Sequence, residues 1–273
     1  MTVLSDLPAP AATAAGPAGP EQHRTTRLGL LGPLRLCRQG TEIAVPAPKH
    51  RALLALLAIN ANRPVQVDRI IGELWQDREP KTARKTLQGY VWRLRTLLGP
   101  GALHTTGNGY ELRAAADAID AVRFGMLAER GRAELLAGRP EQAARLLRPA
   151  LGLWRGPALA DVPVAPGAYA YASRLEEERL TATEWLIEAE LALGRHAEAV
   201  PVLRELVVGQ PLREGLRAQL MLALFRSGRQ AEALAEYGEL RALLREEQGL
   251  DPGRAVSELQ ARILAGDAGL ENG

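Results

Sequence analysis

The sequence predicts a mainly α protein in two parts: an N-terminal winged helix-turn-helix with small β-sheets, then an all-α tetratricopeptide-like domain. Up to residue 115 the pattern is strands, three helices and a hairpin, whereas later residues repeat a Gly-Arg motif at helix boundaries. Residues 1–115 carry 15 Lys and Arg against 8 Asp and Glu, a net +7, and residues 116–273 carry 19 against 24, a net −5. This split indicates an anionic partner for the first part and a protein-binding role for the second.

Four segments are expected: a disordered leader at 1–25, a winged-helix domain at 26–115, a helical domain at 116–266 and a tail at 267–273. The first 20 residues contain no Lys or Arg and no apolar core, so a secretory signal is not expected. The longest strongly apolar run, 52–59, is far shorter than the roughly 20 residues that a membrane span needs. We therefore expect a cytoplasmic, nucleoid-associated protein without membrane contact.

Two short strands are expected at the start of the winged-helix domain. Residues 27–36 alternate and then run apolar, which predicts a strand interrupted by Gly32-Pro33. Residues 39–40 form a turn, and a second short strand covers 42–45. Cys37 lies in this apolar region and is expected to be a small core residue.

Three helices and a hairpin follow. The helix at 48–59 has a leucine-rich stripe, and Asp68 caps a second short helix that runs to Trp75. A third helix, about 81–98, is followed by a hairpin at 103–112. This order is that of a helix-turn-helix with a wing.

The third helix carries the functional argument. Its expected core positions are Ala83, Leu87, Tyr90, Leu94 and Leu97 or Leu98. The opposite side holds Lys81, Lys85, Gln88, Trp92 and Arg95, with Arg84 beside them. In the major groove Arg can bond guanine bidentately and Gln can bond adenine, so this side is a candidate DNA-reading face. The alternative is a solvated charged face, which its position between a short helix and a hairpin disfavours. Lys49, His50 and Arg51 are either phosphate contacts or a polar surface turn.

The acidic part contains a short repeat. Gly-Arg followed by Glu or Gln and Ala recurs at 138–143, 194–199 and 228–233, with the last two copies 34 residues apart. That distance is the tetratricopeptide period, and an insertion containing 154–167 interrupts the first interval. Helix pairs of this kind bury their apolar faces only when at least three stack. Their usual role is binding rather than catalysis.

The sequence lacks the motifs of enzyme chemistry. No lysine lies in a phosphate-binding Gly-rich loop, and the histidines 23, 50, 104 and 196 have no metal-ligand spacing. No serine lies in Gly-x-Ser-x-Gly, and the carboxylates at 176–178 are expected to form a solvated helix face. We therefore expect neither an enzyme nor a metal or cofactor.

Several motifs in one order support a family resemblance. They are LGLLGPLRL (28–36), PKHRALLALL (48–57), ELW (73–75), LQGYVWRLRTLLG (87–99), GNGYEL (107–112), LWRGPAL (153–159), LREGLRAQLMLALFRSGRQAEAL (212–234) and GLDPG (249–253). With these motifs the chain resembles the Streptomyces antibiotic regulatory proteins, which pair an OmpR-type winged helix with a bacterial transcriptional activator domain.

The resemblance implies an activator of antibiotic or other secondary-metabolite genes in an actinomycete. Such proteins bind direct repeats in double-stranded DNA near promoters and recruit RNA polymerase holoenzyme through its sigma factor and other subunits. Two copies in tandem on a direct repeat imply a head-to-tail dimer on DNA.

The resemblance also assigns site residues. The recognition-helix positions are Lys85, Gln88, Gly89, Trp92, Arg93 and Arg95, and the wing positions are Thr105, Thr106 and Asn108. Arg93 is added by the resemblance and is the strongest base-reading or central phosphate candidate. Thr106 stands where the family places an Arg, so a hydroxyl–phosphate contact is expected there.

Two other functions remain possible from the sequence. One is a helical-repeat adaptor that binds proteins, with the winged helix as an auxiliary module. The other is a repressor, which differs from an activator only in its effect on transcription. The basic face of the third helix argues against the adaptor.

Overall fold

The computed structural model describes residues 26–163 and 165–270 of the chain. The expected disordered leader, residues 1–25, and the last three residues of the expected tail lie outside the described residues. Within those residues the chain forms two compact units. The first contains 26–29, 34–119, 162–163 and 165–168, and the second contains 30–33, 120–161 and 169–270.

The first unit begins with a three-stranded antiparallel sheet. Its strands are β1 (Thr26–Gly29), β2 (Arg35–Arg38) and β3 (Thr41–Glu42), in the order β1-β2-β3. Both turn residues between β2 and β3 have positive φ, 53° at Gln39 and 80° at Gly40, as two-residue hairpin turns require. The strand expected at 42–45 corresponds to β3, which is only two residues long and begins one residue earlier. Cys37 is only partly buried, so the expectation of a core residue was only partly right.

The three predicted helices are confirmed as α1 (Pro48–Ile59), α2 (Val67–Trp75) and α3 (Ala83–Leu98). Asp68 lies in the first turn of α2 but makes no cap hydrogen bond. Helix α3 begins later than predicted, because the first i to i+4 hydrogen bond runs from the Thr86 amide to the Thr82 carbonyl, 2.9 Å. Lys81 consequently lies in the turn before α3 rather than on the helix.

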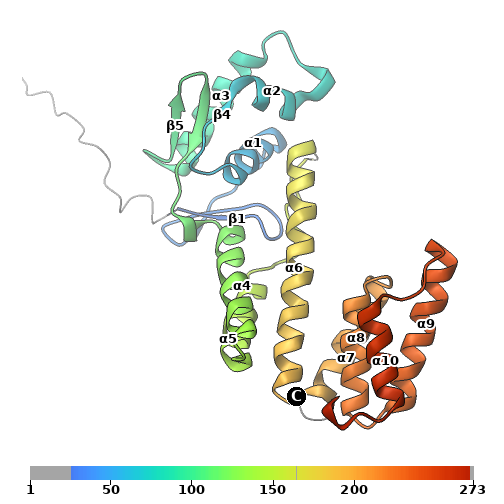
Figure 1. The fold of residues 1–273 in the computed structure, drawn as a ribbon. Coiled ribbons are helices and arrows are strands. Elements are labelled where there is room, and N and C mark those ends of the chain that lie inside the picture. Colours follow the sequence, from blue (N-terminus) through green and yellow to red (C-terminus); the bar gives the residue numbers. More distant parts are fainter. Residues whose placement is uncertain (1–25, 164, 271–273) are drawn as a thin grey trace, which may run out of the picture. The chain divides into compact units, whose positions relative to one another are not determined.

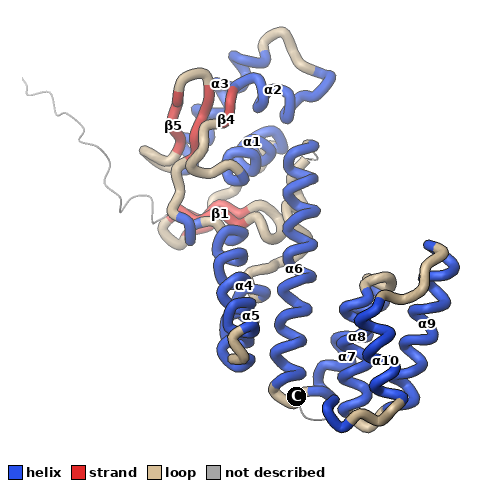
Figure 2. Tube along the Cα trace, in the orientation of Figure 1, coloured by secondary structure: helices blue, strands red, loops and turns tan. Residues whose placement is uncertain are grey.

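A second sheet contains the wing. Strands β5 (Leu103–Thr106) and β6 (Gly109–Leu112) form the predicted hairpin, and β4 (Val65–Gln66) pairs with β6 (Figure 2). Strand β4 was not predicted, because two residues are too few to show an alternating pattern. Gly109 permits this pairing, since a β-carbon there would lie 2.6 Å from the Val65 carbonyl oxygen.

The second unit consists of helices, of which α7 to α10 stand side by side in Figure 1. The helices are α4 (Asp120–Leu136), α5 (Pro140–Leu151), α6 (Pro166–Ala192), α7 (His196–Gly209), α8 (Glu214–Arg226), α9 (Gln230–Gln248) and α10 (Arg254–Leu264), the first residues of α6 belonging to the first unit. This confirms the mainly helical fold class. No helix in the described ranges combines the length and apolarity of a membrane span.

The Gly-Arg motif forms the turns of three helical hairpins, α4–α5, α6–α7 and α8–α9, as predicted. Gly138, Gly194 and Gly228 have φ of 70°, 78° and 75°, the left-handed conformation that ends helices. The amide of the arginine after each glycine donates to the carbonyl five residues earlier, at 2.9–3.0 Å. Each turn therefore satisfies carbonyls that the helix end would leave unbonded.

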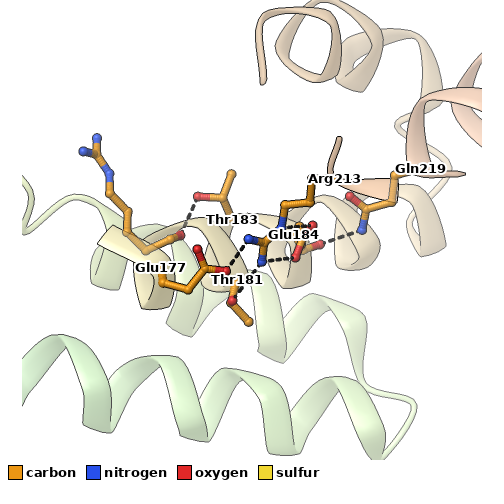
Figure 3. Close-up of polar contacts among 7 residues, drawn as sticks. Glu177, Thr181, Thr183, Glu184, Arg213 and Gln219 are labelled. Carbon is orange, nitrogen blue, oxygen red and sulfur yellow. Dashed lines mark hydrogen bonds and ion pairs between the residues drawn. The ribbon is translucent and has the colours of Figure 1, made fainter. Parts of the chain in front are cut away.

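Arg213 joins α8 to α6 in the second unit (Figure 3). Its guanidinium donates to both carboxylate oxygens of Glu184, at 2.8 and 3.1 Å, and also to Glu177. The Gln219 amide donates to the Glu184 carbonyl at 2.9 Å. The expected solvated carboxylate face at 176–178 is therefore confirmed only in part. Glu177 is exposed although it bonds Arg213, and Glu178 pairs with Arg174 of the same helix, whereas Glu176 accepts the Ala158 amide at 2.7 Å.

Asp120, the first residue of α4, organises the predicted insertion. Its carboxylate accepts the Leu30 amide at 2.6 Å and the Arg155 guanidinium at 3.0 Å. Arg155 also donates from its amide to the Leu31 carbonyl, 2.9 Å, and from its side chain to the Pro33 carbonyl, 2.8 Å. Two sequence motifs more than a hundred residues apart thus meet at one carboxylate.

Replacing Asp120 with Ala should lower the free energy of unfolding by about 2–4 kcal/mol, because two amides and a half-buried guanidinium lose their partner. Glu258→Ala is the matched control: it removes an exposed i,i+4 pair with Arg254 and should cost less than about 1 kcal/mol. Thermal and denaturant unfolding of the full chain measure both. Equal losses of unfolding free energy in the two variants would contradict this stabilising role of Asp120.

Candidate nucleic-acid interface

One stripe of α3 is buried and fixes which residues face outward. The buried residues, all 0–2% exposed, are Ala83, Leu87, Val91, Leu94 and Leu98. The predicted stripe was right at four of these positions, with Leu98 rather than Leu97. It was wrong at Tyr90, which is half-buried, while Val91 takes the core position.

Tyr90 lies outside the core of α3 because its ring packs against aromatic side chains of α1 and α2. Its ring stacks on Trp75 with centroids 6.0 Å apart and meets His50 edge-on at 4.7 Å. The Lys49 ammonium lies 5.8 Å from the Trp75 centroid and donates to the Leu74 carbonyl. This cluster joins α1, α2 and α3 and engages Lys49 and His50 within the unit. Burial, and secondly the positive charge of Arg93, lower the pKa of His50.

The outward side of α3 presents five of the predicted residues, which we call the α3 face: Lys85, Gln88, Gly89, Trp92 and Arg93. All five are exposed, and the Trp92 side chain is 66% exposed. Within the described residues no carboxylate pairs with Lys85 or Arg93, and no hydrogen bond engages the Gln88 amide. The face therefore offers two cations, an amide and an indole to an external partner.

Two predicted cations beside the α3 face are engaged inside the unit. Arg84 forms an ion pair with Asp68 of α2 at 2.5 Å. Arg95 donates from Nε to the Leu103 carbonyl at 3.0 Å and from its terminal nitrogen to the Thr105 hydroxyl at 2.8 Å. Arg95 thus holds the wing against α3, whereas the Arg84–Asp68 pair is exposed on both sides. Lys81, in the preceding turn, is exposed.

The wing residues Thr105, Thr106 and Asn108 are exposed at the tip of the β5–β6 hairpin. Gly107 has φ of 56°, which a two-residue turn needs. The Asn108 carbonyl accepts the Val67 amide at 2.9 Å, which fastens the tip to α2. The Thr106 hydroxyl donates to a Glu111 carboxylate oxygen at 3.5 Å, and the same carboxylate is paired with Arg113 at 3.2 Å.

One exposed residue beside these side chains was missed by sequence reasoning. Thr96 lies on the α3 face side, four residues after Trp92, and its hydroxyl donates to the Trp92 carbonyl at 3.2 Å. Extending the same helical spacing by one step would have found it.

No group of three or more His, Cys, Asp and Glu side chains within the described residues is arranged to hold a metal ion. The side chains of the α3 face, which are two cations, an amide and an indole, are suited to recognition by hydrogen bonds, charge and apolar contact. A helix with this outward chemistry fits the dimensions of a DNA major groove.

Two family models match the chain. The model described as "Transcriptional regulatory protein, C terminal" matches residues 40–112, and the one described as "Bacterial transcriptional activator domain" matches residues 119–264. The first match contains α3 and the wing, and the second contains α4 to α10.

Curated relatives and a solved structure agree with these models. Regulatory protein AfsR of Streptomyces coelicolor is 44% identical and covers 93% of this chain, which spans only 26% of AfsR. Regulatory protein DnrI of Streptomyces peucetius is 37% identical, with 90% of this chain and 94% of DnrI covered. The structure of Mycobacterium tuberculosis EmbR in complex with a low affinity phosphopeptide superposes with a TM-score of 0.86 at 38% identity, covering 89% of this chain and 65% of EmbR.

Arg95→Ala should loosen the wing while leaving α3 folded, because two hydrogen bonds from α3 to β5 are lost. We expect faster amide hydrogen exchange across the β5–β6 hairpin and a loss of about 1–2 kcal/mol in unfolding free energy. Arg84→Ala, which removes only an exposed pair with Asp68, should leave hairpin exchange unchanged. Unaltered hairpin exchange in Arg95→Ala would show that Arg95 does not position the wing.

Proposed function

Because the chain belongs to the Streptomyces antibiotic regulatory protein family of transcriptional regulators, we propose that it activates transcription by binding duplex DNA through the α3 face. The observation that carries this proposal is the pair of unpartnered cations on that face. Lys85 and Arg93 are exposed and unpaired within the described residues, on either side of the Gln88 amide and the Trp92 indole.

The roles of the α3 face follow from the chemistry of the groove. Arg93 presents a planar guanidinium suited to bidentate bonds with guanine, and Gln88 carries the amide that pairs with adenine. Lys85 is a compact charge suited to phosphate. Arg95 already binds groups of β5, so its part is to position the wing, whereas Arg84 forms only an exposed pair with Asp68. Of the wing residues, Asn108 has the side chain best placed for a backbone contact.

We further propose that two copies bind a direct DNA repeat head to tail and recruit RNA polymerase holoenzyme. Three relatives carry regulatory names, AfsR, DnrI and RedD, and the family resemblance implies antibiotic genes as targets. The helical unit supports a protein-contacting role, since stacked helical hairpins offer a large surface. Nucleoid association in the cytoplasm follows from this function.

Selection of DNA from a random pool by the full chain tests the proposal. Retention of duplexes that share a short direct repeat is expected, with affinity that falls as salt rises. Transcription from that repeat with purified polymerase should then increase when the protein is added. Reduced initiation would make it a repressor, and failure to retain any duplex at moderate salt would favour a protein-binding adaptor.

Arg93→Ala should weaken the selected duplex by about 1–3 kcal/mol and relax preference at one base pair, if Arg93 reads a base. Lys85→Ala should weaken all duplexes similarly and reduce the slope of log affinity against log salt by about one. Arg254→Ala, on α10, removes the same charge and serves as the control with unchanged binding. Mobility shifts across a salt series measure all three, and wild-type affinity in Arg93→Ala would remove that residue from the interface.

Gly89→Ala should stabilise the fold and at the same time weaken DNA binding. A β-carbon at Gly89 meets no protein atom within 4 Å, so alanine should raise unfolding free energy by about 0.5–1 kcal/mol through helix propensity. Binding to the selected duplex should weaken, because DNA approaches the bare backbone there. Gly238→Ala in α9 is matched, being exposed and equally open, and should stabilise without altering binding. A Gly89→Ala variant that binds as well as wild type would contradict close approach.

A further inference from the structure

Trp92 differs from every other tryptophan in the described chain. Trp75 stacks on Tyr90, Trp154 meets Phe124 edge-on at 5.4 Å, and Trp185 lies under the Arg132 guanidinium at 5.6 Å. Trp92 has no ring or cation contact within the described residues and is 66% exposed. An indole held in water in this way is an apolar surface available to a partner.

Gly89 extends this apolar surface. Side chains on a helix lean toward its N-terminus, so the indole at position 92 lies over the turn that contains residue 89. The absence of any atom within 4 Å of a β-carbon at Gly89 means that packing does not require glycine there. Glycine instead leaves a bare stretch of backbone beside the indole, bordered by the cations of Lys85 and Arg93.

The chemistry of this patch selects one base. The apolar group on base edges in the major groove is the C5-methyl of thymine, which lies beside the O4 acceptor of the same base. The indole ring supplies an apolar face that can pack against this methyl group. Cytosine carries no methyl group at C5, so it lacks that contact.

We infer that Trp92 is a specificity-determining residue that reads thymine in the major groove, with Gly89 leaving room for the methyl group. This inference rests on the proposed function, since it requires α3 to enter that groove. The flanking cations bring the patch to the anionic duplex, and the patch then supplies the apolar contact that charge alone lacks.

Substitution of single thymines by deoxyuridine tests the inference, because deoxyuridine keeps O4 and lacks only the methyl. The probe is the duplex selected from a random pool by the full chain, with each thymine replaced in turn. Wild type should bind about fourfold more weakly when one particular thymine is replaced, the effect of one buried carbon. In Trp92→Ala that ratio should fall to one, whereas Trp92→Phe should keep part of it through its aromatic face.

Tyr169→Ala is the matched control, because Tyr169 on α6 is also 66% exposed and should leave the thymine ratio unchanged. Equal binding of wild type to every substituted duplex, or an unchanged ratio in Trp92→Ala, would overturn the inference. Both results leave DNA binding itself intact. Failure of the wild type to retain any duplex would instead overturn the proposed function and, with it, the role of Trp92.

Discussion

The candidate interface depends on the burial of a single stripe of α3. A helix turns about 100° per residue, so a rotation by one position would carry Lys85 or Gln88 toward the core at a cost of several kcal/mol. Five core residues that are 0–2% exposed prevent that rotation. With α3 fixed, the bonds of Arg95 to β5 and of the Val67 amide to the Asn108 carbonyl set the wing beside it. The outward chemistry is thus determined by packing on the opposite side.

Sequence periodicity predicted a structural feature correctly wherever that feature depends only on residues close in the sequence. It predicted the buried stripe of α3 at Ala83, Leu87 and Leu94, and the repeated Gly-Arg turns, because a helix face and a left-handed glycine depend on neighbouring residues. It failed where a residue's position depends on contacts with residues far away in the sequence. Tyr90 is drawn from the core by rings on α1 and α2, and β4 exists only because β6 lies opposite. Arg84 and Arg95 looked like open cations because residue type does not reveal an internal partner.

The second unit is held by polar bonds between residues far apart in sequence, which periodicity also misses. Asp120 binds the 30–33 loop and Arg155, and Glu184 receives both the Arg213 guanidinium and, at its carbonyl, the Gln219 amide. Half-buried ion pairs of this kind add little net stability over apolar contacts, yet removing one partner is costly. The leucine-rich helices supply the burial, and these bonds join surfaces that are far apart in the sequence.

Some arginines in the described part of this chain form ion pairs with carboxylates and others stay free to bind an external anion, and the presence of a carboxylate partner distinguishes the two roles. In the second unit guanidiniums meet carboxylates, as in Arg148 with Glu190, Arg213 with Glu184 and Arg217 with Glu236. A guanidinium so engaged would have to leave its carboxylate before it could bind phosphate. An unpaired cation such as Arg93 carries no such cost and neutralises phosphate with release of counterions. The net charge of +2 is therefore a poor guide to binding. What matters is where cations are left without internal partners, and the α3 face is such a place.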